Sequence, residues 1–172
     1  MNLAYRTTQF FRLLFDKPAP QDLSLVEETL SPSLMHLFRG MTAADQTHAI
    51  RVLHTLLEQG QRDPSLLAAA LLHDVGKSHV RPRLWDRVAV VLGTAIVPNA
   101  VQRWGHGEHK GWRRPFIIAA RHPTWGAEMI LAAGGSQELA TLVSRHQDSL
   151  KAKTDTQIDQ LLHHLQEADG MN

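Results

Sequence analysis

Apolar residues recur along most of the chain at the three- and four-residue intervals of a helix face. Ile50, Leu53 and Leu57 follow this spacing, and no stretch alternates convincingly at the two-residue period of a half-buried strand. The pattern therefore predicts an all-α protein without internal repeats. The expected helices cover Leu3–Phe15, Leu23–Leu30, Ser33–Phe38, the stretch from Thr42 to Gly60, Ser65–Asp74, Leu84–Val97, Phe116–Arg121, Thr124–Ala133, Gln137–Leu150 and Thr156–Ala168.

Capping residues mark the ends of two helices in the first half of the chain. Thr42 can cap the first of them, and Gly60 ends it. Asp63 followed by Pro64 is a typical helix start, because an N-cap residue stands before a proline at the first helical position. It opens an apolar helix that ends near Gly76. We expect these two helices to pack against each other.

The pattern changes between residues 80 and 120. Trp104–Trp112 contains three glycines and no helical periodicity, which favours a loop. We therefore expect a single helical-bundle domain over residues 41–170, with a loop-containing insertion at about residues 80–120. An N-terminal helical extension over residues 1–40 would pack on this domain.

Composition narrows the class of protein. At 172 residues, with 43% apolar and 20% charged residues, the chain has the size and content of one globular domain. It has no cysteine, which excludes disulfides, thiolate metal sites and cysteine nucleophiles and suits a cytoplasmic location. We expect no secretory signal, because no charged segment is followed by an apolar one. The longest apolar run, Val88–Val97, is about half the ~20 residues that span a bilayer, so we expect no transmembrane segment.

Charge is concentrated in the predicted insertion. Eight cations and two acids lie between Arg81 and Arg121, although the whole chain has a formal net charge of only +1. Such a basic segment favours a small phosphorylated substrate, nucleic acid or peripheral contact with an anionic membrane. An ordinary solvated surface explains it equally well. No feature of the pattern predicts an oligomeric state.

The candidate chemistry begins with the adjacent pair His73 and Asp74. The seven residues before the pair are all apolar, so their helix should be buried all round and the pair should lie at the edge of the core. An ionised carboxylate in that position needs a compensating partner. A divalent metal meets this need, because imidazole and carboxylate together form a normal ligand set. A capped or salt-bridged pair is the alternative for a His-Asp dipeptide taken alone.

Other histidines and a late aspartate place this pair in a longer pattern. His48 precedes the pair in His48-Ala49-Ile50-Arg51-Val52, and the pair itself stands in Ala70-Leu71-Leu72-His73-Asp74-Val75-Gly76-Lys77. With a closing aspartate, these segments resemble the H…HD…D pattern of the HD superfamily of metal-dependent phosphohydrolases. The segment His122-Pro123-Thr124-Trp125-Gly126-Ala127 and the later His146 are similar to the longer pattern of members that hold two metals. Those members include HD-GYP phosphodiesterases and bacterial dinucleoside-tetraphosphate hydrolases.

The resemblance covers about Thr42 to Asp169 and implies an HD-type helical bundle with two divalent ions, iron, manganese or another transition metal. It implies that the first metal is held by His48, His73, Asp74 and Asp169. Asp74 would bridge to a second metal held by His122 and His146. Asp148 is the alternative to Asp169 as the last ligand, although i,i+2 positions such as His146 and Asp148 do not face each other on a helix.

Two cations near these ligands are candidates for phosphate contacts. The resemblance suggests that Lys77 points into the site, whereas its position after the helix also suits a partner of the helix dipole. Arg51 is one turn from His48 and could bind a phosphate bidentately or form a structural salt bridge. Together with Asp74, these two residues are the candidate catalytic residues.

We therefore expect hydrolysis of a phosphomonoester or phosphoanhydride, nucleotide-like, through metal-activated water. After His146 the chain continues Gln147-Asp148-Ser149-Leu150 and lacks the HD-GYP motif, so cyclic-di-GMP hydrolysis is not supported. One alternative is a catalytically weak regulatory or binding module for a phosphorylated ligand or an anionic membrane. Another is a di-iron oxygenase, because some HD relatives use iron in that way.

Overall fold

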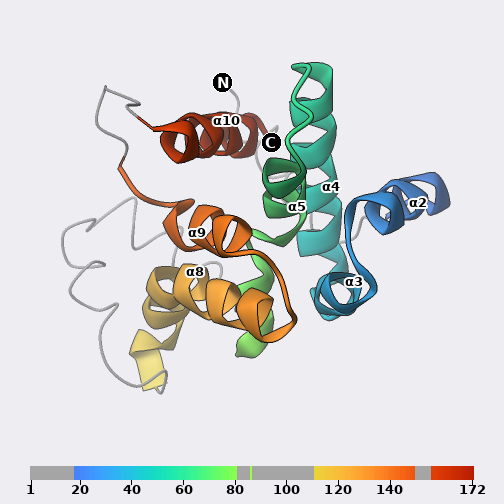
Figure 1. Ribbon diagram of the computed structural model, residues 1–172. Coiled ribbons are helices and arrows are strands. Elements are labelled where there is room, and N and C mark those ends of the chain that lie inside the picture. The colour runs from blue at the N-terminus through green and yellow to red at the C-terminus, as the bar shows by residue number, and fades with distance from the viewer. Residues whose placement is uncertain (1–17, 81–85, 87–110, 150–155) are drawn as a thin grey trace, which may run out of the picture.

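The computed structural model describes residues 18–80, 86, 111–149 and 156–172, and every regular element in these ranges is a helix (Figure 1). This confirms the all-α prediction. The predicted helices Leu3–Phe15 and Leu84–Val97 and most of the predicted loop and basic insertion lie outside the described residues. The elements are α2 (Pro20–Thr29), α3 (Pro32–Arg39), α4 (Ala43–Glu58), α5 (Pro64–Leu72), the 3-10 turns η1 (Val75–His79) and η2 (Gly111–Arg113), α8 (Arg114–Ala132), α9 (Gln137–Arg145) and α10 (Gln157–Met171).

The predicted capping residues begin their helices through side-chain hydrogen bonds. Thr42 Oγ1 accepts a hydrogen bond from the Asp45 amide at the start of α4, at 3.2 Å. Asp63 Oδ1 accepts one from the Leu66 amide at the start of α5, at 2.9 Å. Each bond satisfies an amide that has no partner in the first turn of a helix, which is why such residues fix where a helix begins.

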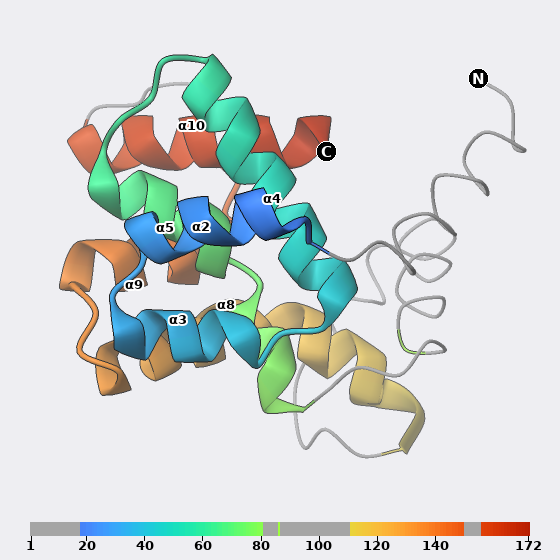
Figure 2. The same ribbon diagram turned by 90° about the vertical axis from the view of Figure 1, so that its right-hand side faces the viewer.

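Helix α5 is the centre of the bundle. It packs against α2 and α3 on one side, α4 on another, and α9 and α10 on the opposite side (Figures 1 and 2). Leu66, Leu71 and Leu72 are fully buried, as expected for a helix that is apolar all round. Helix α5 ends at Leu72 inside the molecule, so the next residues, His73 and Asp74, are also buried and lie next to the apolar core.

The helices before residue 40 contribute to the same core. Val26 of α2 and Phe38 of α3 are fully buried in one cluster with residues of α4, α5, α9 and α10. The division into an extension and a domain at residue 40 stays a prediction. No helix among the described residues is both long and apolar enough to cross a bilayer.

The prediction of two helices on either side of Pro123 is wrong. Helix α8 continues through Pro123, although this residue lacks an amide donor. The helix packs along its length against α9 and η1, and that packing outweighs the lost hydrogen bond. The contact with η1 is so close that a Cβ added to Gly76 would lie 1.9 Å from the His122 carbonyl oxygen.

Two helix ends also differ from the sequence prediction. Helix α9 ends at Arg145 rather than Leu150, with His146 as its C-cap residue. Helix α10 runs to Met171 rather than Ala168, so Asp169 lies within its last turn. As a result, the candidate ligand His146 lies at the C-terminal end of α9, and the candidate ligand Asp169 lies in α10.

Candidate metal centre

Six side chains from five parts of the fold converge beside the end of α5. They form two groups, and in each group one donor atom of every residue lies within 4.8 Å of the others. The first group contains His48 of α4, His73 at the end of α5 and Asp169 of α10. The second contains Asp74, His122 of α8 and His146 at the end of α9. These are the six residues that the sequence suggested as metal ligands, and the adjacent His73 and Asp74 join the two groups.

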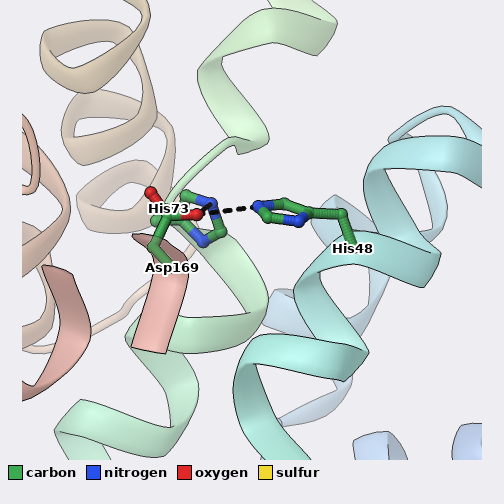
Figure 3. A group of neighbouring side chains, drawn as sticks. All are labelled: His48, His73 and Asp169. Carbon is green, nitrogen blue, oxygen red and sulfur yellow. Dashed lines mark hydrogen bonds and ion pairs between the residues drawn. The ribbon is translucent and has the colours of Figure 1, made fainter. Parts of the chain in front are cut away.

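The first group is partly open to solvent. His48 Nε2 and Asp169 Oδ1 are hydrogen-bonded at 2.8 Å, and His73 Nε2 lies 3.6 Å from the same oxygen (Figure 3). The side chains of His48 and Asp169 are 22% and 37% exposed, whereas that of His73 is only 2% exposed. Solvent and small solutes therefore reach this group from the side of α4 and α10.

The second group is buried. His122 Nε2 lies 3.3 Å from Asp74 Oδ1 and 3.3 Å from His146 Nε2. Among the residues that the structure describes, few polar side chains are buried, and all three members of this group are among them. The group lies where α8 packs closely against both α9 and η1.

Backbone carbonyls fix the tautomer of the three buried histidines. The Nδ1 atom of His73 bonds the Ala70 carbonyl at 3.0 Å, that of His122 bonds the Ile118 carbonyl at 3.1 Å, and that of His146 bonds the Val143 carbonyl at 2.7 Å. A carbonyl oxygen only accepts hydrogen bonds, so each Nδ1 atom carries the proton. In the neutral rings the Nε2 atoms therefore carry the lone pairs that could bind a metal ion. Metal-ligating histidines commonly have their other ring nitrogen hydrogen-bonded in this way.

This tautomer leaves an imbalance in the second group. When both rings are neutral, with the proton on Nδ1, the Nε2 lone pairs of His122 and His146 face each other at 3.3 Å. The Asp74 carboxylate adds further lone pairs on the same side. A cation placed among these atoms removes the imbalance, and a set of imidazole and carboxylate donors suits a divalent transition metal.

Burial and neighbouring charges keep these groups in the state that binds a cation. Burial, together with His73 and His122, lowers the pKa of His146 to about 4, and burial also lowers the pKa of His73. Burial alone would raise the pKa of Asp74, but Lys77, His73 and His122 outweigh it and hold this pKa well below its usual range. Near neutral pH the two histidines are therefore neutral and the carboxylate is ionised.

The pKa of Asp169 is also lowered. Burial acts against this shift, and the hydrogen bond from His48 and the proximity of His73 outweigh it. The structure thus brings an ionised Asp169 to the first group. Asp148, the alternative last ligand, instead pairs with Arg145 at 3.1 Å, is 52% exposed and belongs to neither group.

The two candidate phosphate-binding cations differ in position. Lys77 Nζ forms an ion pair with Asp74 Oδ2, and its side chain is 30% exposed. This contact places the ammonium group at the border between the buried carboxylate and solvent. Arg51 lies on α4 one turn after His48 and is partly buried.

Two residues of the site were missed in the sequence. Gly76 allows η1 to touch α8, because any larger residue would meet the His122 carbonyl oxygen and the Gly126 amide nitrogen. Gln147 brings its side-chain Nε2 atom within 3.5 Å of His122 Nε2. Gly76 could have been suspected from its place directly after the His-Asp pair, and Gln147 from its place after His146.

A family model for the HD domain matches residues 46–171, which run from the first turn of α4 to the end of α10 and include all six candidate ligands. The chain belongs to the HD domain family. HD domains bind divalent metals and are mostly hydrolases, so the family indicates a metal-dependent activity of the hydrolase type. Searches among curated proteins and among solved structures gave no match for this HD chain.

Proposed function

We propose that this HD domain is a phosphohydrolase that acts on a phosphomonoester or phosphoanhydride, nucleotide-like. One observation carries the proposal: two groups of ligand atoms adjoin at His73 and Asp74, and three buried histidines direct Nε2 lone pairs into them. An arrangement of this kind suits two divalent cations, and paired cations are a common means of cleaving phosphate bonds.

The residues divide between two ions in a way that their distances support. His48, His73 and Asp169 would hold the first ion, and His122 and His146 the second. Asp74 would contact both, because its Oδ2 atom lies 3.6 Å from His73 Nε2 and its Oδ1 atom lies 3.3 Å from His122 Nε2. Divalent ions held by these residues would neutralise phosphate charge and acidify a bound water.

The chain's own residues contribute in a separate way. Lys77 neutralises Asp74 in the absence of a metal, and a cation at Asp74 would replace it in that role. The ammonium group, already partly exposed, would then be available to a phosphate oxygen of the substrate. Arg51, one turn from His48, is the second candidate for such a contact. The basic segment 81–121 would attract the anionic substrate, although most of it lies outside the described residues.

Metal content and turnover together test the proposal. Protein purified without chelator is analysed for metals and then assayed with Mn²⁺ against a panel of nucleotides and simple phosphate esters. We expect about two ions per chain and hydrolysis that His73→Ala and Asp74→Ala abolish while circular dichroism stays unchanged. Asp148→Ala is the matched control, because this exposed carboxylate belongs to neither group.

Three other outcomes would contradict the proposal. Protein without any bound metal would exclude a metal centre of this kind. Iron with an oxygen-dependent absorption spectrum would indicate a di-iron oxygenase. Tight binding of a phosphorylated ligand without hydrolysis would indicate a regulatory or binding module.

A further inference from the structure

We infer that Gln147 is an additional ligand of the second ion and binds it through the side-chain amide oxygen. This inference rests on the proposed metal centre, and it adds a residue that the HD pattern in the sequence did not suggest. Gln147 follows His146 directly, and its side-chain amide reaches back to His122, another member of the second group.

The backbone on both sides of Gln147 is held in place. Gln166 of α10 donates its side-chain amide to the His146 carbonyl at 3.0 Å and to the Asp148 carbonyl at 2.8 Å. The Asp148 amide bonds the Arg145 carbonyl at 2.8 Å, which closes the turn after α9. Although Gln147 is exposed, it therefore lies on a fixed turn, and its side chain is directed at the buried group.

The distance from Gln147 to His122 is that expected between two ligands of one ion. Donor atoms at about 2.1 Å from a tetrahedral metal lie about 3.4 Å from each other. The Gln147 amide nitrogen is 3.5 Å from His122 Nε2. His122 Nε2 in turn is 3.3 Å from His146 Nε2 and 3.3 Å from Asp74 Oδ1. The end of the glutamine side chain thus occupies a ligand position relative to His122.

The amide can present either of its two atoms at this position. Without a cation, its N–H donates to the lone pair of His122 Nε2, whose ring proton is on Nδ1. A cation bound at Nε2 would repel the N–H group and attract the oxygen. Rotation of the amide by half a turn exchanges these atoms, which are nearly equal in size, without displacing the side chain.

A competing role for Gln147 is donation of an N–H to the bound substrate alone. The variants Gln147→Ala and Gln147→Glu separate the two roles. Alanine removes both functions, whereas glutamate keeps an oxygen ligand, adds negative charge and removes the donor. A metal ligand therefore tolerates glutamate, and a donor to an anion does not.

The test is a calorimetric titration of the chelator-treated, full-length chain with Mn²⁺ in the absence of substrate. The binding event that disappears in His122→Ala identifies the second ion. We expect Gln147→Ala to weaken this event by about tenfold or more and to leave the other event unchanged. Gln147→Glu should bind at least as tightly as the wild-type chain. Gln160→Ala, which truncates an exposed glutamine on α10, is the matched control and should behave as wild type.

The outcomes distinguish failure of this inference from failure of the proposed function. Wild-type affinity for both ions in Gln147→Ala overturns the ligand role and leaves the metal centre intact. A Gln147→Glu variant that binds the second ion as weakly as Gln147→Ala also overturns it. A wild-type chain that binds no Mn²⁺ overturns both the inference and the proposed function.

Discussion

The two groups of the candidate metal centre differ in how their atoms are balanced without a metal. In the first group a donor meets an acceptor, because His48 Nε2 is hydrogen-bonded to Asp169 Oδ1 at 2.8 Å. In the second group the Nε2 atoms of the neutral His122 and His146 rings present lone pairs to each other at 3.3 Å, and the donor to His122 is Gln147, outside the group. A bond between two of its own members balances the first group, whereas the second relies on Gln147 and Lys77, which lie beside it.

Their surroundings strengthen this difference. The first group is partly exposed, so water reaches its polar atoms, whereas the second is buried, where a lost polar partner is not replaced by solvent. The buried group therefore depends on neighbouring side chains for its balance, whereas the open group depends on its own members and on solvent. We therefore expect the second group to contribute more to the dependence of the fold on metal.

Asp74→Ala should have the largest effect, because this carboxylate faces both groups. We expect the affinity for both Mn²⁺ ions to fall by more than about a hundredfold, since loss of an outer-shell partner alone costs up to that much. Calorimetric titration measures both events in one experiment. A variant that keeps one event at wild-type affinity would show that Asp74 serves a single group.

Gly76→Ala should separate the two groups. The new Cβ would lie 1.9 Å from the His122 carbonyl oxygen and 2.6 Å from the Gly126 amide nitrogen, so η1 must move away from α8. We expect the free energy of unfolding to fall by about 1–3 kcal/mol or more. The affinity for the second ion should fall, while the first group, on α4, α5 and α10, should keep its affinity.

The matched control is Gly170→Ala on α10, where a Cβ would meet no atom within 4 Å. Urea denaturation measures the stability of both variants, and this control should be as stable as the wild-type chain or slightly more so. Equal loss of both ions in Gly76→Ala would contradict a role confined to the second group.

The metal-free protein should lose stability in mildly acidic solution. The pKa of His146 is about 4 in the folded state and about 6.5 when the residue is unfolded and exposed. As the pH falls through 6.5, the unfolded state takes up a proton that the folded state does not take up until about pH 4. The free energy of unfolding should therefore fall by roughly 3 kcal/mol across this window.

Above pH 6.5 this contribution is absent, because His146 is neutral in both states. His73, whose pKa burial also lowers, acts in the same direction. Urea denaturation at a series of pH values after chelator treatment measures the slope, and His146→Asn should make it shallower. A stability that is constant from pH 7 to pH 5 would contradict the buried, neutral state of these histidines.

The smallest effect is expected from Asp148→Asn. This exposed carboxylate pairs with Arg145 at the surface, so its loss should change the free energy of unfolding by less than about 0.5 kcal/mol and leave Mn²⁺ binding unchanged. Asp169→Asn should instead weaken binding of the first Mn²⁺ ion, which is the binding event that remains in the His122→Ala variant. The reverse result would make Asp148 the last ligand.

Local sequence rules were sufficient where the cause is local. Thr42 and Asp63 begin their helices because a side-chain oxygen satisfies an amide three residues later, and both residues are visible in the sequence. Pro123 shows the limit of such rules. Proline stops most helices, and the packing of α8 against α9 and η1 explains why this helix continues through Pro123.

The all-α class and the central apolar helix follow from the sequence pattern, and the resemblance to the HD superfamily suggested the six residues that converge at the end of that helix. The tertiary structure brought the members of each group together, and it placed Asp169 rather than Asp148 beside His48. It also decided the tautomers and brought Gln147 to His122. The physical reason is that residue types and helix periods are local properties. Opposed lone pairs and approaches within 4 Å arise only when helices distant in sequence pack together.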